Sequence, residues 1–587
     1  MKNSLKYLLL IVSILFACEK SANNPEDNPI PVTPEYSVAY IETDKACYSP
    51  NDEVKFVVDK EISSSAIIRY RHLNETIEEV TYQGKIWKWK APSKDFTGYM
   101  VDLYEVIDGQ EVIYGSVAVD VSSDWTRFPR YGFLSKFDSD VSAEEIKTTL
   151  DQFMRYHING LQYYDWHNKH HKPLKMDGNT PTETWQDIAR RDVSFNTVKD
   201  YIQEAKSRNI SSMSYNLLYG AWEDCESDGV AKEWMVYNDD NHQNINKHEL
   251  DHNWALSDIL VVNPVNENWQ DYIFAETENI YQFLDFDGWH LDQLGDRGKV
   301  YDYQGNSIDL KQGYYSFLTK LRQNFPDKRM VLNAVNQFGQ AQILSTEVNF
   351  AYTEVWFPNE KYADLAQIIL DNNALSDNTK KTVLAAYMNY DLANGTGYFN
   401  TPAVLYTDAV IFVFGGSHLE LGEHMLGKEY FPNNNLLMRS DLKTSLIANY
   451  DFMVAYENLL RDGGTFNSPQ ISSTDGKLDL NAWPPQYNKV AVVGKEIGNR
   501  QIIHLLNFAN VTSLAWRDNF GTQTFPQPEE KCNLEINVDK KISKLWFASP
   551  DTQFGTARNI EFIQNDNKIV FQLSSLKYWD MLVLEYE

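Results

Sequence analysis

YGFLSKFDSDVSAEEIKTTLDQFMRYHINGLQYYD, residues 131–165, sets the pattern that decides the fold. Tyr131–Lys136 predicts a strand, and Ser142–Tyr156 predicts a helix whose first turn Ser142 can cap together with Glu145. Gly160–Asp165 predicts the next strand. A strand, a helix and a second strand in this order are typical of a βαβ unit with parallel strands.

The same alternation continues to about residue 460. Further strands are predicted over Ser211–Leu217, Gly288–Asp292, Met330–Ala334, Asn349–Glu354, Val383–Tyr390 and Phe412–Leu419. The helices predicted between and after them cover Phe195–Ser207, Trp269–Phe283, Gln312–Asn324, Ala363–Asp371 and Asp441–Leu460. Eight strands with crossover helices predict that residues 123–465 form a (β/α)₈ TIM barrel.

All-β segments flank this region, which makes the predicted protein multidomain. Short strands such as Val54–Val58 and Ala66–Tyr70, separated by turn residues, predict an immunoglobulin-like sandwich over residues 36–122. Helical patterns stop after Gly464, and strands such as Arg500–Asn507 predict a second sandwich over residues 466–587.

The first eighteen residues read as a processing signal, with a basic start and an apolar stretch too short to span a bilayer. The stretch ends in Leu15-Phe16-Ala17-Cys18, which resembles the lipobox of bacterial lipoproteins. Lipidation at Cys18 would place the protein in the cell envelope, on the outer membrane surface or in the periplasm, with the Pro-rich residues 19–35 as a tether. An ordinary signal peptide with an incidental cysteine is the alternative.

Composition narrows the classes of partner. A net charge of −29 repels phosphate backbones and so argues against nucleic acid. Cys47, Cys225 and Cys532 make no disulfide framework. The histidines at 167, 170 and 171 lack a spacing that defines a metal site, so we predict no metal and no cofactor. The oligomeric state is left open.

Two strands end in a carboxylate. With a period of two, Asp292 shares a face with Gly288 and His290, and it is the last residue of its predicted strand. Glu354 ends another strand in the same way. Catalysis in barrels of this kind sits at the carboxyl ends of the strands, and cleavage of a glycosidic bond needs two carboxyl groups. The alternative is that both acids pair with basic residues at strand ends.

The segment Asp287-Gly-Trp-His-Leu-Asp-Gln-Leu-Gly-Asp-Arg-Gly298 resembles the nucleophile segment of glycoside hydrolase family 66, which contains dextranases and cycloisomaltooligosaccharide glucanotransferases. Tyr352-Thr-Glu-Val-Trp356 is similar to the acid/base segment of that family, and Tyr164-Asp-Trp-His167 to its segment on the second strand.

The resemblance implies a retaining glycoside hydrolase that cleaves internal α-1,6 bonds of dextran and releases isomaltooligosaccharides. Asp292 would be the nucleophile and Glu354 the general acid and base. Contacts to the sugar are expected from Asp165, Trp166, His290, Trp356, His418 and Glu420. A cycloisomaltooligosaccharide glucanotransferase and a non-catalytic glucan-binding lipoprotein are the alternatives.

Members of the family that cyclise their product carry a carbohydrate-binding module inserted late in the catalytic domain. Residues 390–446 leave no room for such a module, since two strands, their helices and loops account for them. We therefore expect linear products.

Overall fold

The structure is a computed structural model that describes residues 38–587. Cys18 and the predicted signal and tether lie outside the described residues. No helix among the described residues is both long enough and apolar enough to cross a membrane.

Five parallel strands form the first half of the central region, in the order β21-β18-β14-β9-β8. Hydrogen bonds join each strand to the next one along the chain, as crossover connections require. The structure gives the strands at 211–217 and 288–292 the bounds that the sequence predicts. The five are β8 (Tyr131–Leu134), β9 (Gly160–Tyr163), β14 (Ser211–Leu217), β18 (Gly288–Asp292) and β21 (Arg329–Leu332).

Three more parallel strands, β22 (Ala351–Glu354), β23 (Thr382–Ala385) and β25 (Ser417–His418), form a second sheet. A parallel bridge between Asn333 and Tyr352 connects it to the end of β21. On its other side, the backbone N–H of Phe133 in β8 donates to the carbonyl of Leu421 at 3.1 Å, just beyond β25. The two sheets are thus linked at both edges.

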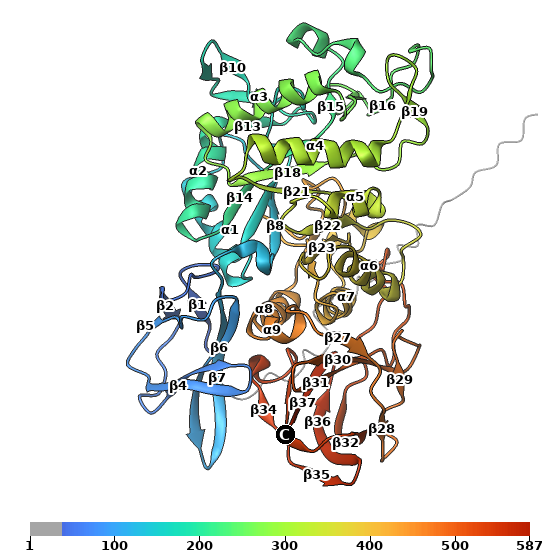
Figure 1. Ribbon diagram of the computed structural model, residues 1–587. Coiled ribbons are helices and arrows are strands. Elements are labelled where there is room, and N and C mark those ends of the chain that lie inside the picture. Colours follow the sequence, from blue (N-terminus) through green and yellow to red (C-terminus); the bar gives the residue numbers. More distant parts are fainter. Residues whose placement is uncertain (1–37) are drawn as a thin grey trace, which may run out of the picture. The chain divides into compact units, whose positions relative to one another are not determined.

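Helices separate the strands along the chain (Figure 1). Ser142 and Glu145 form the predicted capping box at the start of the first helix. The helix predicted over Phe195–Ser207 has those bounds in the structure. The nine α-helices of the described residues are α1 (Ala143–Arg155), α2 (Phe195–Ser207), α3 (Glu267–Phe283), α4 (Leu310–Asn324), α5 (Gln340–Leu344), α6 (Tyr362–Leu375), α7 (Thr401–Val413), α8 (Ser440–Ala455) and α9 (Glu457–Leu460).

The strand predicted over Phe412–Leu419 is wrong at its start. Phe412 lies in the last turn of α7, and only Ser417–His418 is a strand. Every residue of α7 is buried, so the helix has no polar face and its sequence shows none of the 3.6-residue alternation that marks an amphipathic helix. The strand predicted over Val383–Tyr390 is also shorter in the structure, because β23 ends at Ala385.

Short strands occur in the loops that follow the parallel strands. These pieces extend the loops rather than the central sheets, since each pairs only with a neighbour from the same set. They are β10 (Met176–Asp177), β11 (Thr180–Pro181), β12 (Thr184–Gln186), β13 (Asp192–Ser194), β15 (Gly220–Ala221), β16 (Lys247–His248), β17 (Ile259–Val261), β19 (Val300–Tyr301), β20 (Ser307–Ile308), β24 (Gly397–Tyr398) and β26 (Leu436–Leu437).

Before β8, two antiparallel sheets share one hydrophobic core. Side chains alternate along the strands, as in Glu53–Val58, where Val54, Phe56 and Val58 are buried. One sheet contains β1 (Ile41–Thr43), β2 (Glu53–Val58) and β5 (Ile86–Lys90), and the other contains β4 (Glu75–Thr81), β3 (Ile67–His72), β6 (Thr97–Ile107) and β7 (Gln110–Val121).

After α9 the described chain is again all β, in two sheets around a further core. The larger sheet holds β27 (Thr465–Asn467), β29 (Leu480–Ala482), β30 (Val490–Ile497), β31 (Arg500–Asn507), β37 (Trp579–Tyr586), β33 (Ile542–Ala548) and β34 (Arg558–Asn559). The smaller one holds β28 (Ile471–Ser473), β32 (Glu529–Asn537), β36 (Lys568–Leu576) and β35 (Phe562–Asn565).

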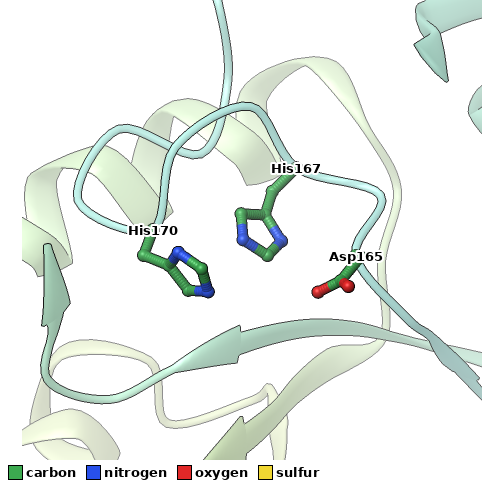
Figure 2. Close-up of side chains that lie close together, drawn as sticks. All are labelled: Asp165, His167 and His170. Atoms are coloured by element: carbon green, nitrogen blue, oxygen red, sulfur yellow. The ribbon is translucent and has the colours of Figure 1, made fainter. Parts of the chain in front are cut away.

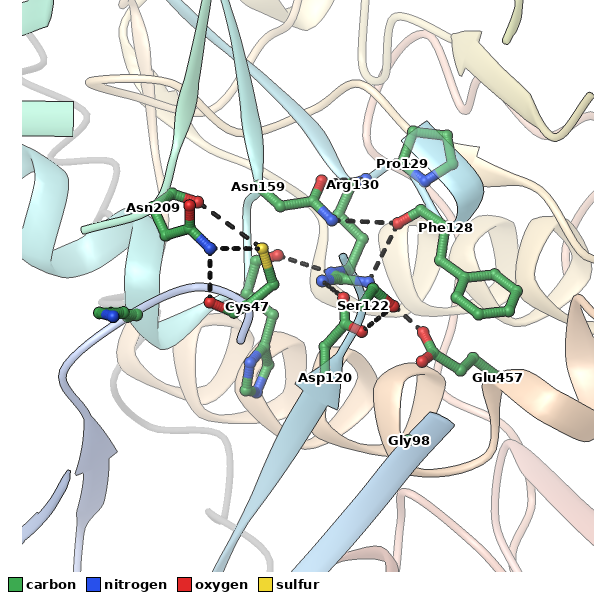
Figure 3. Close-up of polar contacts among 12 residues, drawn as sticks. Cys47, Gly98, Asp120, Ser122, Phe128, Pro129, Arg130, Asn159, Asn209 and Glu457 are labelled. Atoms are coloured by element: carbon green, nitrogen blue, oxygen red, sulfur yellow. Dashed lines mark hydrogen bonds and ion pairs between the residues drawn. The ribbon is translucent and has the colours of Figure 1, made fainter. Parts of the chain in front are cut away.

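A buried arginine fastens the N-terminal sheets to the parallel strands (Figure 3). Arg130, just before β8, pairs with Asp120 of β7 at 2.5 Å and with Glu457 of α9 at 3.5 Å. Its guanidinium also donates to the carbonyls of Phe128 and His157. An arginine with several fixed acceptors can be buried at a tolerable cost, so this residue holds three segments in one arrangement.

Candidate active site

A cleft of about 710 Å³ opens at the carboxyl ends of the parallel strands. Its volume is in the range of pockets that hold small organic ligands. The lining includes the predicted acids Asp292 and Glu354, and also Asp165, His290 and Trp356. Five of the eight residues expected to act on or contact substrate therefore lie around one cavity.

Asp292 and Glu354 share one hydrogen-bond donor. The Nδ2 of Asn333 donates to Asp292 Oδ1 at 2.9 Å and to Glu354 Oε2 at 2.9 Å. The Asn333 Oδ1 in turn accepts from the Glu354 backbone N–H at 3.2 Å, which fixes the orientation of the amide. A single amide at the end of β21 therefore sets the distance between the two carboxylates.

The remaining oxygens have separate donors. Asp292 accepts from the Tyr215 hydroxyl at 2.7 Å and from the Gln293 backbone N–H at 2.7 Å. Glu354 accepts from the Tyr387 hydroxyl at 2.8 Å. Asp292 thus receives three hydrogen bonds from these groups and Glu354 two, and more donors favour the charged form of a carboxylate.

Both acids hold a proton more tightly than a carboxyl group in water. Burial raises the pKa of Asp292. Burial, followed by the nearby charge of Asp292, raises the pKa of Glu354 to about 7. In the part of the chain that the structure describes, no Lys or Arg forms an ion pair with either acid. Because the charge of Asp292 is one cause of the raised pKa of Glu354, Glu354 is the acid of the pair that keeps its proton toward neutral pH.

The floor of the cleft is aromatic. His290 stacks between Tyr131 and Tyr215, with ring centroids 5.7 and 5.8 Å away, and its Nδ1 lies 3.2 Å from the Tyr131 hydroxyl. Burial lowers the pKa of His290 to about 3, so the imidazole is neutral and can present only a hydrogen bond to a ligand.

Asp165 is a third buried carboxylate in the cleft lining. Its Oδ2 lies 3.9 Å from Arg191, too far for a hydrogen bond. Burial raises the pKa of Asp165 to about 7, although Arg191 opposes the shift. A carboxyl group poised between its two forms can both accept from and donate to a sugar hydroxyl.

Asp165, His167 and His170 lie close together on the loop after β9 (Figure 2). They offer one ligand atom each, and these atoms are all within 4.8 Å of one another. The His170 Nδ1 accepts from the indole N–H of Trp222 at 3.0 Å, so a neutral His170 carries its proton on Nε2. His170 then has no free lone pair, which leaves Asp165 and the unpartnered Nδ1 of His167 as possible ligands in this cluster, fewer than a metal site usually provides.

His171 forms a second such group with Asp224 and Asp228. Its Nδ1 accepts from the Trp222 backbone N–H at 3.1 Å, which leaves Nε2–H to donate to Asp228 at 3.1 Å. Asp228 also accepts from Lys169 and Lys172. These contacts fix the loop and leave no ring nitrogen free for a metal.

Of the two tryptophans predicted to contact the sugar, the structure places one at the cleft and the other in the core. Trp356 lines the cleft, whereas Trp166 is fully buried against Trp185 and Phe286 and is absent from the lining. The structure adds Trp254 and Tyr430, which line the cleft, are 42% and 41% exposed, and lie 6.3 Å apart. Half-exposed aromatic rings at a cleft are suited to stack on the apolar faces of sugars.

His418 and Glu420 do not lie where the sequence places them. Both are buried, and neither lines the cleft. The His418 Nε2–H faces the Ala386 carbonyl at 2.7 Å, and its Nδ1 faces Asp408 at 2.8 Å and Glu420 at 3.3 Å. Burial alone would lower the pKa of His418, but Glu420 and Asp408 outweigh it and raise the pKa to about 10. The group is a buried ion cluster in which two carboxylates share one imidazolium.

Sequence reasoning missed the three residues that hold the acids: Tyr215, Asn333 and Tyr387. Tyr215 and Asn333 fall near the carboxyl ends of strands that the sequence predicts correctly in place. Polar side chains at these ends were the available signal, since all parallel strands present that end to the same cleft.

Two buried carboxyl groups at an open cleft, one of which has its pKa raised to about 7, are an arrangement that suits glycoside hydrolysis. The chain matches the family model of Glycosyl hydrolase family 66 over residues 43–583, and it belongs to that family.

Relatives of two kinds are similar to this chain. A cycloisomaltooligosaccharide glucanotransferase of Niallia circulans is 27% identical, in an alignment that covers 98% of this chain and 75% of the relative. A dextranase of Streptococcus salivarius is 23% identical, with 83% of this chain and 67% of the relative covered.

Among solved structures, a Paenibacillus cycloisomaltooligosaccharide glucanotransferase complexed with cycloisomaltoheptaose matches with a TM-score of 0.85 and 25% identity. That match covers 93% of this chain and 99% of the other. A maltogenic α-amylase of Thermotoga neapolitana, 10% identical with a TM-score of 0.50 over 78% of this chain and 99% of the other, shares the fold alone.

Proposed function

We propose that this protein is a retaining endo-hydrolase of α-1,6-glucan. The observation that carries the proposal is the Asn333 amide, which donates to Asp292 and to Glu354 at 2.9 Å each and so holds the two acids at one bond-cleaving distance. Family membership and the named activities of the relatives supply the class of substrate.

Asp292 is the proposed nucleophile. Its three donors favour the ionised form against the effect of burial, and the carboxylate can attack the anomeric carbon to form a glucosyl-enzyme. Glu354 is the proposed general acid, because its raised pKa of about 7 keeps a proton available for the leaving oxygen. The resulting carboxylate of Glu354 then takes a proton from the attacking water.

The geometry supports retention of configuration. Asp292 Oδ1 and Glu354 Oε2 each lie 2.9 Å from the Asn333 nitrogen, so these two oxygens, though not the other two of the pair, cannot be further apart than twice that distance. Retaining enzymes place their carboxyl groups about 5–5.5 Å apart, whereas inverting enzymes leave about 6.5–9.5 Å for a water.

A glucanotransferase is the second candidate, and the similarity to enzymes of that name favours it. One observation favours hydrolysis to linear products. Residues 390–446 of the described chain contain short strands, α7 and the start of α8, and no inserted module.

The proposed frame is a (β/α)₈ barrel over residues 123–465, with an immunoglobulin-like sandwich over 36–122 and a second sandwich over 466–587. The chain order of the eight parallel strands and the links at both edges of their two sheets support the closed barrel. One core in each flanking pair of sheets supports the sandwiches.

Product analysis on dextran, with starch and pullulan beside it, tests the substrate. Linear isomaltooligosaccharides of several lengths should appear early from dextran, and proton NMR should show the α-anomer first. Predominantly cyclic products would show that the protein is a glucanotransferase and not a hydrolase. Activity on starch but not on dextran would refute both, and an initial β-anomer would refute Asp292 as nucleophile.

We further propose that Cys18 is lipidated and anchors the enzyme in the cell envelope. The lipobox-like sequence before it supports this. Cys18→Ala should move the protein from the membrane fraction to the soluble fraction, because acyl chains supply the attachment. Unchanged fractionation of this variant would contradict the anchor.

A further inference from the structure

A second cavity lies where the central region meets the C-terminal sheets. It has a volume of about 170 Å³ and borders α6, the end of α7, the end of α9 and the strands β27 and β30. None of its lining residues lines the substrate cleft. Since a water molecule takes about 30 Å³ of liquid, the cavity has room for a polyatomic ligand.

Three cationic side chains line this cavity: Lys381, Arg461 and Lys495. They are only 5%, 2% and 3% exposed. No Asp or Glu is among the lining residues. Buried cations are normally paired with carboxylates, so three of them around one space without an acid is an unusual arrangement.

The hydrogen bonds of these cations are incomplete. Lys495 Nζ donates to the carbonyls of Leu459 and Leu460, which end α9, and Lys381 Nζ donates to the carbonyl of Asn378. An ammonium group has three protons, so Lys381 has two unassigned and Lys495 one. The buried Arg461 Nη1 has no hydrogen-bond partner, while its Nε and Nη2 donate to backbone carbonyls.

The nearest acids have other partners. Asp462 forms an ion pair with Arg127, and Glu457 pairs with Arg130. Burial, followed by the positive charge of Lys381, lowers the pKa of Lys495 to about 7. Burial, followed by Arg127 and Arg461, lowers the pKa of Lys381 to about 8. The cations therefore destabilise one another within a chain whose net charge is −29.

We propose that this cavity binds a small tetrahedral oxyanion of the phosphate or sulfate class, held by Lys381, Arg461 and Lys495. The unassigned ammonium protons of Lys381 and Lys495 supply donors, Arg461 adds positive charge to the lining, and a dianion supplies the missing negative charge. Gly463 and Gly464 form part of the wall, and no atom lies within 4 Å of the position where a Gly463 Cβ would stand, which leaves the wall open there.

Such an anion would stabilise the contact between the central region and the C-terminal sheets. Lys381 precedes β23, Arg461 follows α9, and Lys495 belongs to β30, so the bound ion would join three segments distant in sequence. A ligand that binds only the folded state raises the midpoint of thermal unfolding with its concentration.

The test is isothermal titration of the full chain with inorganic phosphate and with sulfate at constant ionic strength in chloride. We expect saturable binding of one anion, and a rise of about 2 °C in the unfolding midpoint at ten times the dissociation constant. Lys495→Met and Lys381→Met should each weaken binding at least tenfold, because each removes a donor and a charge from the cavity.

Lys489→Met is the matched control, since Lys489 lies just before β30, carries the same charge and does not line the cavity. It should bind phosphate as the unaltered protein does. Absence of saturable binding in the unaltered protein, or equal binding in all three variants, would overturn the proposal. If a variant fails to fold, sulfate density in the cavity of the unaltered protein, sought by crystallography, still decides it.

Discussion

Two clusters of buried acids lie near the carboxyl ends of the parallel strands, and their neighbours give them opposite properties. Asp292 and Glu354 are held by the neutral donors Asn333, Tyr215 and Tyr387 and face a cleft. Asp408 and Glu420 share the imidazolium of His418 and face no cleft.

The difference lies in what balances the charge. In the His418 cluster one imidazolium is shared by two carboxylates, burial and then Glu420 raise the pKa of Asp408, and no member lines the cleft, so the cluster serves the fold. Where only neutral groups surround the carboxylates, one acid must keep its proton, which is the condition that acid catalysis needs. Buried pairs of acids thus have different expected roles, decided by the third group that each pair contacts and by whether the pair lines the cleft.

The largest effect is expected on catalytic rate, and only from changes in the cluster that lines the cleft. Asp292→Asn and Glu354→Gln should each lower kcat on dextran by about 10³-fold or more, because each removes a group that acts on the bond. Circular dichroism should show the folded spectrum for both variants. Activity within tenfold of the unaltered enzyme would remove the residue from the catalytic pair.

The second largest effect is expected from removing the cation of the cluster formed by His418, Asp408 and Glu420. His418→Leu leaves two buried carboxylates without their cation, and breaking a buried ion pair costs about 3–5 kcal/mol of unfolding free energy. Chemical denaturation should show this loss, while KM for dextran stays unchanged in the folded fraction. A raised KM with unaltered stability would instead restore His418 to the sugar site, and Glu420→Gln provides a milder second variant.

Asn333→Ala should lower kcat/KM by about 10²-fold, the size of effect seen when one well-placed donor is lost. The acids lose the amide that fixes their separation, although both remain present. Asn324→Ala, an exposed change at the end of α4, is the control and should leave the rate unaltered. Equal rates for the two variants would show that the amide does not position the pair.

A smaller effect concerns pH. Glu354 acts as an acid only while protonated, so kcat/KM should fall as pH rises through about 7. The Tyr387 hydroxyl lowers the pKa of Glu354, and Tyr387→Phe should therefore shift this alkaline limb upward by about one unit. Tyr390→Phe is the control, because that hydroxyl donates to Glu429. A downward shift in Tyr387→Phe would contradict the assignment.

The smallest effect is on stability. The pKa of Glu354 rises on folding from 4.5 to about 7, so its proton contributes stability that is full below about pH 4.5 and is lost as pH rises through 7. The Glu354→Gln variant has no carboxyl group to titrate at this position, so it does not lose this stability. The midpoint of thermal unfolding of the variant, minus that of the unaltered protein, should therefore be about 2 °C higher at pH 8 than at pH 5. A difference in unfolding midpoint that does not change with pH would mean that burial does not raise the pKa of Glu354.

Period and position singled out Asp292 and Glu354, and the resemblance to family 66 supplied their predicted roles, but neither predicted the residues around them. Asp292 and Glu354 stand out because each ends a strand with clear two-residue alternation. His418 also ends a strand, but β25 is only two residues long, and nothing in such a short pattern shows whether its end reaches the cleft. Trp166 is typical of a sugar platform by type, yet only tertiary packing shows that it is buried.

The helix α7 has a consequence for how the protein is made. Its Tyr406 ring packs on Phe508 and Tyr578, and its Thr407 donates to the Trp516 carbonyl, so part of its cover comes from residues about a hundred positions or more further along the chain. The ribosome delivers α7 well before that cover exists. Until the last strands emerge, the side of α7 that faces them lies uncovered, and a chain cut at residue 465 would leave it so. We therefore expect a fragment that ends at residue 465 to aggregate more readily than the full chain.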